Sequence, residues 1–334
     1  MKLPLYPLLS LALALLTPAL HAERETIRLA DKHMRDAAVL ADPESETYYL
    51  VSSMFHGRDV DHRRGVVMAY TSHDLEHWEG PHKIFETPEA FWPGVTMRGI
   101  WAPEMHSYKG KYYLFLTFNS STELCEQWRD WLPRVRRGSQ ILVSDSPLGP
   151  FEPFERKPTL PEDMMTLDGT LWVEDGTPYM VYCHEWVQIV NGTVEMIQLK
   201  DDLSGTVGEP RRLFYGSEAP WSQMLADRGA WITDGPSFYT SKSGKLFMIW
   251  SSVGEGGYTV GLAISDSGKL AGPWRQQAEP VFDRDGGHGC LFQTFDGKLM
   301  MALHQPNHRT ERIHLFELED TGETLRIVRE VTQD

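Results

Sequence analysis

The sequence predicts an all-β fold, a single five-bladed β-propeller, over residues 23–334. One unit of roughly 60 residues recurs five times along the chain. Each unit holds four short strands separated by Gly, Pro, Asp and Asn, which is the composition of a propeller blade. A β-sandwich would show turn signals without a repeated unit, and the helical periodicity of an α/β fold is almost absent.

The second strand of each unit is the most apolar and marks the repeat. These strands begin at Tyr48, Tyr112, Pro178, Leu246 and Leu299. The third strands begin at Val66, Gln140, Val194, Thr259 and Arg312, and each is followed by a less regular fourth strand. Five matches in the same order indicate five copies of one blade.

The first strand of each unit is expected to line a central channel, because the innermost strands of all blades surround one axis. We expect these strands in the segments that begin at Met34, Ile100, Leu167, Ile232 and Gly286. One ionisable residue in each segment lies at a similar distance before the second strand, namely Asp36, Glu104, Asp168, Asp234 and His288. The repeat therefore predicts that every blade delivers one ionisable side chain to one end of the axis.

Residues 1–22 have the features of a secretory signal peptide. Lys2 precedes the apolar run Leu8 to Leu16, and a cleavage site follows Ala22. Prolines interrupt the run, which argues against a membrane span, and no later stretch is long and apolar enough for one. The pattern predicts a secreted or periplasmic protein.

The overall charge limits the partners of the chain. The formal net charge is -15 at pH 7, which disfavours nucleic acid. The basic run Arg129 to Arg137 is expected to be a solvated loop. The three cysteines are widely spaced and predict neither a zinc site nor a disulfide framework. We predict no protein partner and no organic cofactor.

Four carboxylates gathered in one channel point to chemistry. A single Asp before Gly is usually a turn residue. Carboxylates crowded together repel one another, and the repulsion raises the pKa of at least one of them. Glycosidases use two carboxyl groups of unlike pKa as acid and base. The predicted convergence therefore favours hydrolysis of a glycosidic bond.

The order of the motifs resembles glycoside hydrolase family 43 over essentially the whole mature chain. The matching segments are Arg35-Asp36, Trp101-Ala102-Pro103-Glu104, Asp168-Gly169-Thr170, Thr233-Asp234-Gly235-Pro236 and Gly287-His288-Gly289. The resemblance implies a five-bladed propeller that inverts the anomeric carbon. It implies Asp36 as general base, Asp168 as the carboxylate that orients the acid and adjusts its pKa, and Asp234 as general acid. It also implies a structural Ca²⁺ or Na⁺ on the axis near His288, commonly bound through water.

Two positions depart from the family pattern. Ala37 stands where the family usually has Pro, and Asp234 stands where most members have Glu. Asp is shorter by one carbon–carbon bond, about 1.5 Å, and a misplacement of about 1 Å can cost around a hundredfold in rate. Glu185 is therefore an alternative acid, because its strand should end at the same rim as Asp168. We favour Asp234 slightly over Glu185.

Further residues are expected to contact the sugar. Arg35 and Glu104 are candidates for binding substrate, although Glu104 could instead anchor Arg35 or Arg98 in the channel. Trp101 and Trp186 are expected to stack on sugar rings. Trp92, Trp221 and Trp231 are expected to pack in the β core, which is the more usual role of tryptophan.

The resemblance implies α-L-arabinofuranosides, β-xylosides or β-galactosides of plant polysaccharides as substrates. The stretches 119–137 and 215–230 could wall the channel into an exo-acting pocket, so we expect an inverting exo-α-L-arabinofuranosidase. The alternatives are a β-xylosidase or exo-β-galactosidase of the same fold, or a carbohydrate-binding propeller that has lost catalysis. A retaining fructosidase-like hydrolase would need its two carboxyl groups about 5 Å apart.

Overall fold

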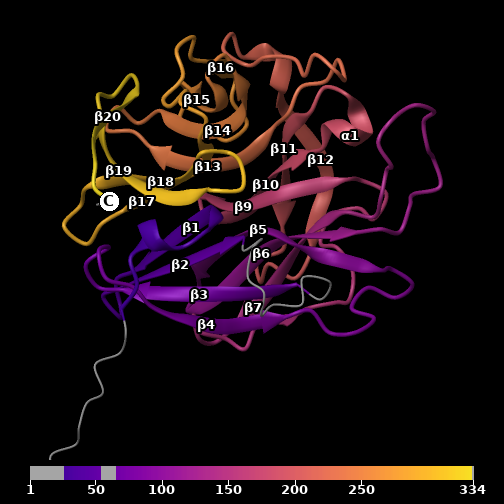
Figure 1. The fold of residues 1–334 in the computed structure, drawn as a ribbon, viewed down its shortest axis with the longest axis horizontal. Coiled ribbons are helices and arrows are strands. Elements are labelled where there is room, and N and C mark those ends of the chain that lie inside the picture. Colours follow the sequence, from indigo (N-terminus) through magenta and orange to yellow (C-terminus); the bar gives the residue numbers. More distant parts are fainter. Residues whose placement is uncertain (1–25, 54–64, 333–334) are drawn as a thin grey trace, which may run out of the picture.

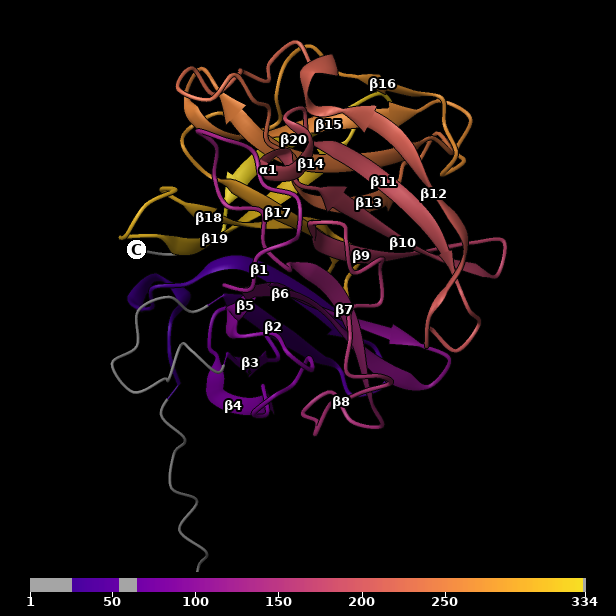
Figure 2. The ribbon, with the colours of Figure 1, turned by 90° about the vertical axis from the view of Figure 1, so that its right-hand side faces the viewer.

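The computed structural model describes residues 26–53 and 65–332 of the chain. In this part of the chain, twenty strands form five four-stranded antiparallel sheets, each built from consecutive strands (Figures 1 and 2). Helical structure in these described ranges is limited to three short turns, η1 (Leu29–Asp31), α1 (Trp186–Ile189) and η2 (Gly216–Glu218). The predicted five-bladed propeller is confirmed.

The blades follow one another along the chain. Blade 1 contains β1 (Arg35–Asp42), β2 (Thr47–Ser53), β3 (Val66–Ser72) and β4 (Glu79–Glu86). Blade 2 contains β5 (Met97–Tyr108), β6 (Lys111–Ser120), β7 (Gly138–Ser144) and β8 (Glu152–Pro153). Blade 3 contains β9 (Thr166–Glu174), β10 (Thr177–His184), β11 (Thr193–Leu199) and β12 (Thr206–Tyr215). Blade 4 contains β13 (Asp234–Thr240), β14 (Leu246–Gly254), β15 (Gly257–Ser265) and β16 (Trp274–Gln276). Blade 5 contains β17 (Gly287–Gln293), β18 (Leu299–Gln305), β19 (Arg312–Asp320) and β20 (Leu325–Glu330).

The first strands of the blades form a closed ring. β1 contacts β5, β5 contacts β9, β9 contacts β13, and β13 contacts β17, which returns to β1. Both views show the last blade beside the first (Figures 1 and 2). Residues at equivalent positions of these five strands therefore meet around one axis.

The second strands are buried because neighbouring blades cover both of their faces. All seven residues of β2 are buried, and so are most residues of β14 and β18. Trp221 packs on Trp250 with ring centroids 4.7 Å apart, and Trp92 is 3% exposed. The apolar runs that marked the repeat are the core between the blades.

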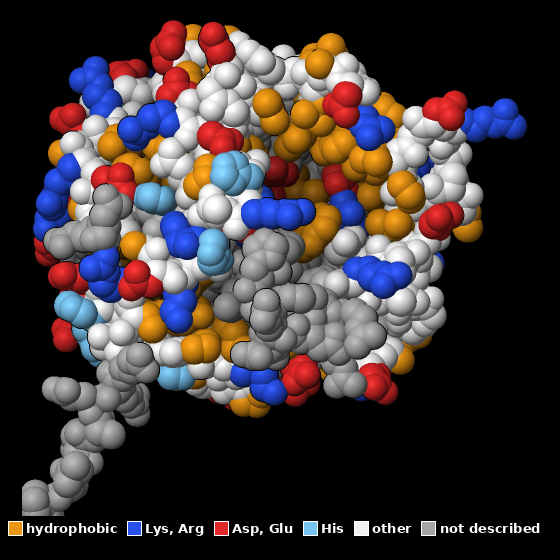
Figure 3. All heavy atoms as spheres, viewed as in Figure 1, with side chains coloured by type: hydrophobic (Ala, Val, Ile, Leu, Met, Phe, Trp, Pro, Cys, Tyr) orange, Lys and Arg blue, Asp and Glu red, His pale blue; other side chains and the backbone are white. Residues whose placement is uncertain are grey.

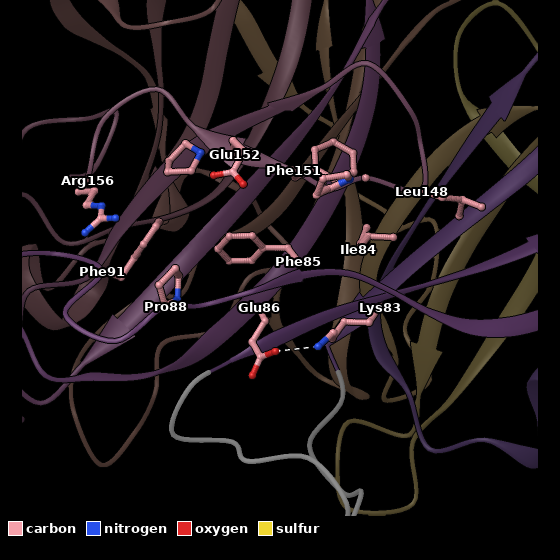
Figure 4. Close-up of a pocket in the computed structure, with 13 residues that line it drawn as sticks. Lys83, Ile84, Phe85, Glu86, Pro88, Phe91, Leu148, Phe151, Glu152 and Arg156 are labelled. Atoms are coloured by element: carbon pink, nitrogen blue, oxygen red, sulfur yellow. Dashed lines mark hydrogen bonds and ion pairs between the residues drawn. The ribbon is translucent and has the colours of Figure 1, made fainter.

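A hollow of about 400 Å³ lies at the outer rim, between β4 and the segment 148–156 (Figure 4). Phe85 and Phe91 lie among its lining residues, and the ion pair between Lys83 and Glu86 spans 2.8 Å at its edge. It shares no residue with the cavity on the propeller axis described below.

No helix in the described part of the chain has the length and apolar character needed to cross a membrane. The predicted signal peptide, residues 1–22, lies outside the described residues.

Candidate active site

A cavity of about 320 Å³ opens where the innermost strands begin. All five first strands contribute to its lining, together with the connection from β10 to α1. The lining residues are Arg35, Asp36, Trp101, Ala102, Leu167, Asp168, Glu185, Trp186, Ile232, Asp234, Tyr258 and His288. The volume is at the small end of the range for ligand sites, about 300–1,000 Å³. The space-filling view shows a hollow on one face with acidic side chains recessed among hydrophobic ones (Figure 3).

Each innermost strand carries a β-bulge beside the cavity. One residue at every bulge has a positive φ: Asp36 (51°), Ala102 (41°), Asp168 (54°), Gly235 (52°) and His288 (51°). The strand pairing shifts register at the same five places. Non-glycine residues are uncommon in this region of φ, and such strain is often found at functional sites. Its repetition in all five blades makes it a feature of this fold.

The bulges correct one expectation from the repeat. Asp36, Asp168 and His288 are equivalent, but the matching residues of blades 2 and 4 are Ala102 and Gly235. Asp234 lies one residue before its bulge position, and Glu104 lies two residues after. The prediction of one equivalent ionisable residue per blade is therefore wrong in two blades, because counting back from the second strand allowed a shift of one or two residues along the first strand.

Asp36 is held in its ionised form. It is 7% exposed, and its Oδ1 lies 3.3 Å from Arg35 Nε, 3.4 Å from His304 Nδ1 and 3.6 Å from His288 Nδ1. Burial is the largest single influence and raises the pKa, but His288, Arg35 and His304 together outweigh it and lower the pKa to about 2. Such a carboxylate is suited to act as a base.

Asp168 is buried beside His288 and close to the other two aspartates. Its Oδ2 accepts a hydrogen bond of 3.0 Å from the Gly235 N–H and lies 3.8 Å from His288 Nδ1. Burial raises the pKa of Asp168, and the charges of Asp234 and Asp36 raise it further. The residue lies where the motif places the modulating carboxylate.

Asp234 accepts a hydrogen bond of 2.8 Å from the Tyr258 hydroxyl. Burial raises its pKa, and repulsion from Asp36 acts in the same direction. A carboxyl group with a raised pKa retains its proton and can donate it. Asp234 therefore has the character of an acid, whereas Asp36 has that of a base.

Glu185 also lies in the cavity, but it has a cationic partner. Its Oε2 forms an ion pair with Arg137 Nη1, and Arg137 Nε donates to Asn119 Oδ1 at 3.0 Å. The guanidinium lies over the ring of Trp101 at 4.3 Å. Burial raises the pKa of Glu185, while the charge and hydrogen bond of Arg137 lower it. A carboxylate paired with a guanidinium donates a proton less readily. Asp234 instead accepts a hydrogen bond from a neutral partner, the Tyr258 hydroxyl.

The comparison with protein families agrees with this geometry. The sequence model for "Glycosyl hydrolases family 43" matches residues 31–329. The chain belongs to this family.

Two named proteins are similar to this chain in sequence. The chain is 24% identical over 230 residues to an extracellular exo-alpha-(1->5)-L-arabinofuranosidase of Streptomyces avermitilis, covering 65% of this chain and 44% of that protein. It is 23% identical over 206 residues to alpha-L-arabinofuranosidase 43 of Humicola insolens, covering 60% of this chain and 40% of that protein. The chain thus spans less than half the length of these two relatives.

A solved structure covers nearly the whole chain. The endo-arabinase of Bacteroides thetaiotaomicron VPI-5482 is 35% identical, with a TM-score of 0.77, over 88% of this chain and 97% of that one. A thermostable family-43 glycoside hydrolase, 20% identical with a TM-score of 0.72, shares the fold.

Family membership suggests a cation on the axis near His288. The ring of His288 packs tightly, since a Cβ added at Gly235 would lie 2.9 Å from it. Among the described residues, no group of three or more His, Cys, Asp or Glu side chains could hold a metal ion. This donor set does not fit a directly chelated Ca²⁺ or Na⁺ at His288, and no catalytic step is derived through a cation. An ion bound near His288 through water stays a prediction.

His288 itself supplies positive charge on the axis. Burial is the largest influence and lowers its pKa, but Asp168, Asp36 and Asp234 together raise it. A protonated imidazole at this position favours the ionised forms of the surrounding carboxylates.

The remaining predicted residues divide between the cavity and its surroundings. Arg35, Trp101 and Trp186 line the cavity, whereas Glu104 does not. Glu104 Oε2 lies 3.0 Å from His106 Nε2, which fits a structural role better than contact with a sugar.

Sequence reasoning missed two residues of the site, namely Tyr258 and Arg137. Arg137 belongs to the basic run that was expected to be solvated. That expectation is wrong for Arg134 and Arg137, whose side chains are only 5% and 11% exposed. Their position in the chain could have identified Arg134 and Arg137, because residues 119–137 were already expected to form a wall of the channel.

Proposed function

We propose that this chain is an inverting glycoside hydrolase that releases terminal α-L-arabinofuranosyl units from plant polysaccharides. The observation that carries the proposal is the contrast between two carboxyl groups in one cavity. Cationic neighbours lower the pKa of Asp36, while burial and a neighbouring acid raise that of Asp234. Glycosidases assign their base and acid by such a contrast.

In the proposed reaction, Asp36 accepts a proton from water while that water attacks the anomeric carbon. Asp234 donates its proton to the oxygen of the leaving group on the opposite face of the sugar. Asp168 keeps the acid in place, because it hydrogen-bonds to the backbone of the residue that follows Asp234. Tyr258 fixes the other side of the acid through its hydroxyl.

Arg137 favours Asp234 over Glu185 as the acid. With its carboxylate paired to Arg137, Glu185 is better placed to accept a hydrogen bond from a sugar hydroxyl. Apolar surface for the C–H face of the sugar comes from Trp101 and Trp186. The Arg137 guanidinium lies over the ring of Trp101.

The arabinofuranosyl unit is proposed from the relatives, whose names all refer to arabinose-containing substrates. Release of single units is proposed from the small cavity and its wall. The segment 121–137 packs on α1 beside the cavity, where Trp131 Nε1 donates to the Val187 carbonyl at 2.7 Å. Secretion is part of the proposal and rests on residues 1–22 and on the extracellular relative.

A substrate panel tests the proposal. The protein is incubated with the nitrophenyl glycosides of α-L-arabinofuranose, β-xylose and β-galactose, and with arabinan and arabinoxylan oligosaccharides. We expect hydrolysis of the arabinofuranoside and release of free arabinose from the oligosaccharides. Shorter oligosaccharides without free arabinose would indicate endo action, and no hydrolysis of any member would favour a binding propeller.

A further inference from the structure

The backbone N–H of each bulge residue is capped by a side chain, and in four blades the cap follows one rule. The N–H donates to a side chain at the end of the second strand of the preceding blade. Ala102 donates to Ser53 Oγ (2.8 Å), Asp168 to Thr117 Oγ1 (2.9 Å), His288 to Ser251 Oγ (2.8 Å) and Asp36 to His304 Nδ1 (3.2 Å).

Cys183 occupies the fifth position of this series. The strand pairing shows the equivalence, because each capping residue pairs with the residue just before the bulge of its own blade. The five pairs are Ser53 with Arg35, Thr117 with Trp101, Cys183 with Leu167, Ser251 with Asp234 and His304 with Gly287. By the rule of the other blades, Cys183 should cap Gly235.

The Gly235 N–H instead donates to Asp168 Oδ2 at 3.0 Å. Sulfur is a weak acceptor, and a buried N–H needs a partner. Cys183 is fully buried, and burial followed by the charges of Asp168 and Asp234 raises its pKa well above the usual value. It therefore remains a thiol, which competes poorly with a carboxylate for this N–H.

We propose that Cys183 is a positioning residue that leaves the Gly235 N–H to Asp168 and thereby fixes Asp168 beside the proton donor Asp234. A hydroxyl at this position would capture the N–H, as in the other blades, and would release the carboxylate. The inference rests on the proposed function and adds a residue that does not line the cavity.

The test uses two substitutions, Cys183→Ser and Cys183→Ala. Serine resembles cysteine more closely than alanine does, yet we expect Cys183→Ser to cause the larger loss in kcat. Cys183→Ser is nearly isosteric but introduces an acceptor. We expect it to lower kcat on an arabino-oligosaccharide about tenfold to a hundredfold, which is the effect of losing one hydrogen bond to a charged group. Its acidic pH limb should move to higher pH, because Asp168 loses a donor that favours its ionised form. Cys183→Ala leaves a small void but no acceptor, and it should lose less than fivefold in kcat.

A merely structural role predicts the opposite order, with Ser closer to the wild type than Ala. That order, or equal effects of the two changes, would overturn the proposal. The same pair of substitutions at Cys290, a free thiol outside the cavity lining, serves as the control and should leave the pH profile unchanged. Melting temperatures of all four variants separate loss of folding from loss of positioning.

Two further measurements keep the test decisive. In an Asp168→Ala background, the additional change Cys183→Ser should have no further effect on kcat, since the bond it removes is already absent. A crystal structure of Cys183→Ser should show Oγ accepting from the Gly235 N–H. If the wild type hydrolyses no glycoside, the proposed function fails, and the crystal structure still decides whether Cys183 controls this N–H.

Discussion

At the scale of single residues, three buried aspartates have different pKa values because their neighbours differ. His288 and Arg35 lower the pKa of Asp36, whereas burial and like charge raise the pKa of Asp168 and Asp234. Their motifs were recognisable in the sequence because each is local. The residues that tune them come partly from other strands. Tyr258, for example, lies on β15, and no local pattern marks it.

The assignment of the acid predicts unequal behaviour of two variants. Asp234→Asn should lose about a hundredfold or more in kcat on an arabino-oligosaccharide but much less on nitrophenyl arabinofuranoside, whose leaving group needs little protonation. Glu185→Gln should instead raise KM on both substrates. Steady-state kinetics on the two substrates check this, and the reverse pattern would make Glu185 the acid.

His304 predicts how stability depends on pH. Burial lowers the pKa of His304 from 6.5 to about 4 in the folded protein. The unfolded chain therefore takes up this proton first as the pH falls. The stability contributed by neutral His304 is fully present above pH 6.5 and is lost as the pH falls towards 4, by about 3 kcal/mol at most.

Denaturant unfolding at several pH values, compared between the wild type and His304→Gln, measures this contribution. The variant should lose less stability than the wild type between pH 6.5 and 4. His73→Gln, a change at an exposed histidine, should keep the wild-type dependence. Equal slopes for wild type and His304→Gln would show that His304 is not neutral in the folded protein.

At the scale of elements, the strands were predictable and the bulges were not. The apolar second strands begin within one residue of the expected positions, because burial between blades demands apolar side chains on both faces. The bulges depend on the register between the first and second strands, which residue counting alone does not set. For this reason Ala102 and Gly235, rather than Glu104 and Asp234, proved equivalent to Asp36.

The wall beside the cavity predicts an effect on substrate binding. Trp131 packs edge-on against Trp186 at 6.1 Å and hydrogen-bonds to the backbone of α1. Trp131→Ala should loosen Trp186 and raise KM several-fold with a smaller change in kcat, because the platform binds the sugar and does not transfer protons. Phe154→Ala, at a 38% exposed aromatic residue that does not line the cavity, is the control and should change KM little. A larger loss in kcat than in binding would contradict this role.

At the scale of the whole molecule, ring closure creates the site. Asp36 and His304 are 268 positions apart in the sequence, yet they share a hydrogen bond because β17 returns to β1. The repeat was sufficient to predict that distant first strands converge. It could not predict how the connecting segments lie beside the cavity, since the connection 121–137 between β6 and β7 is longer than the corresponding connection 185–192 of blade 3.

The most direct test of the central claim is the configuration of the first product, observed by NMR while an α-linked arabino-oligosaccharide is hydrolysed. With Asp36 as base and Asp234 as acid, the sugar should appear first as the β-anomer and then mutarotate, and Asp36→Asn should abolish its formation. Initial release of the α-anomer, or full activity of Asp36→Asn, would contradict the inverting mechanism.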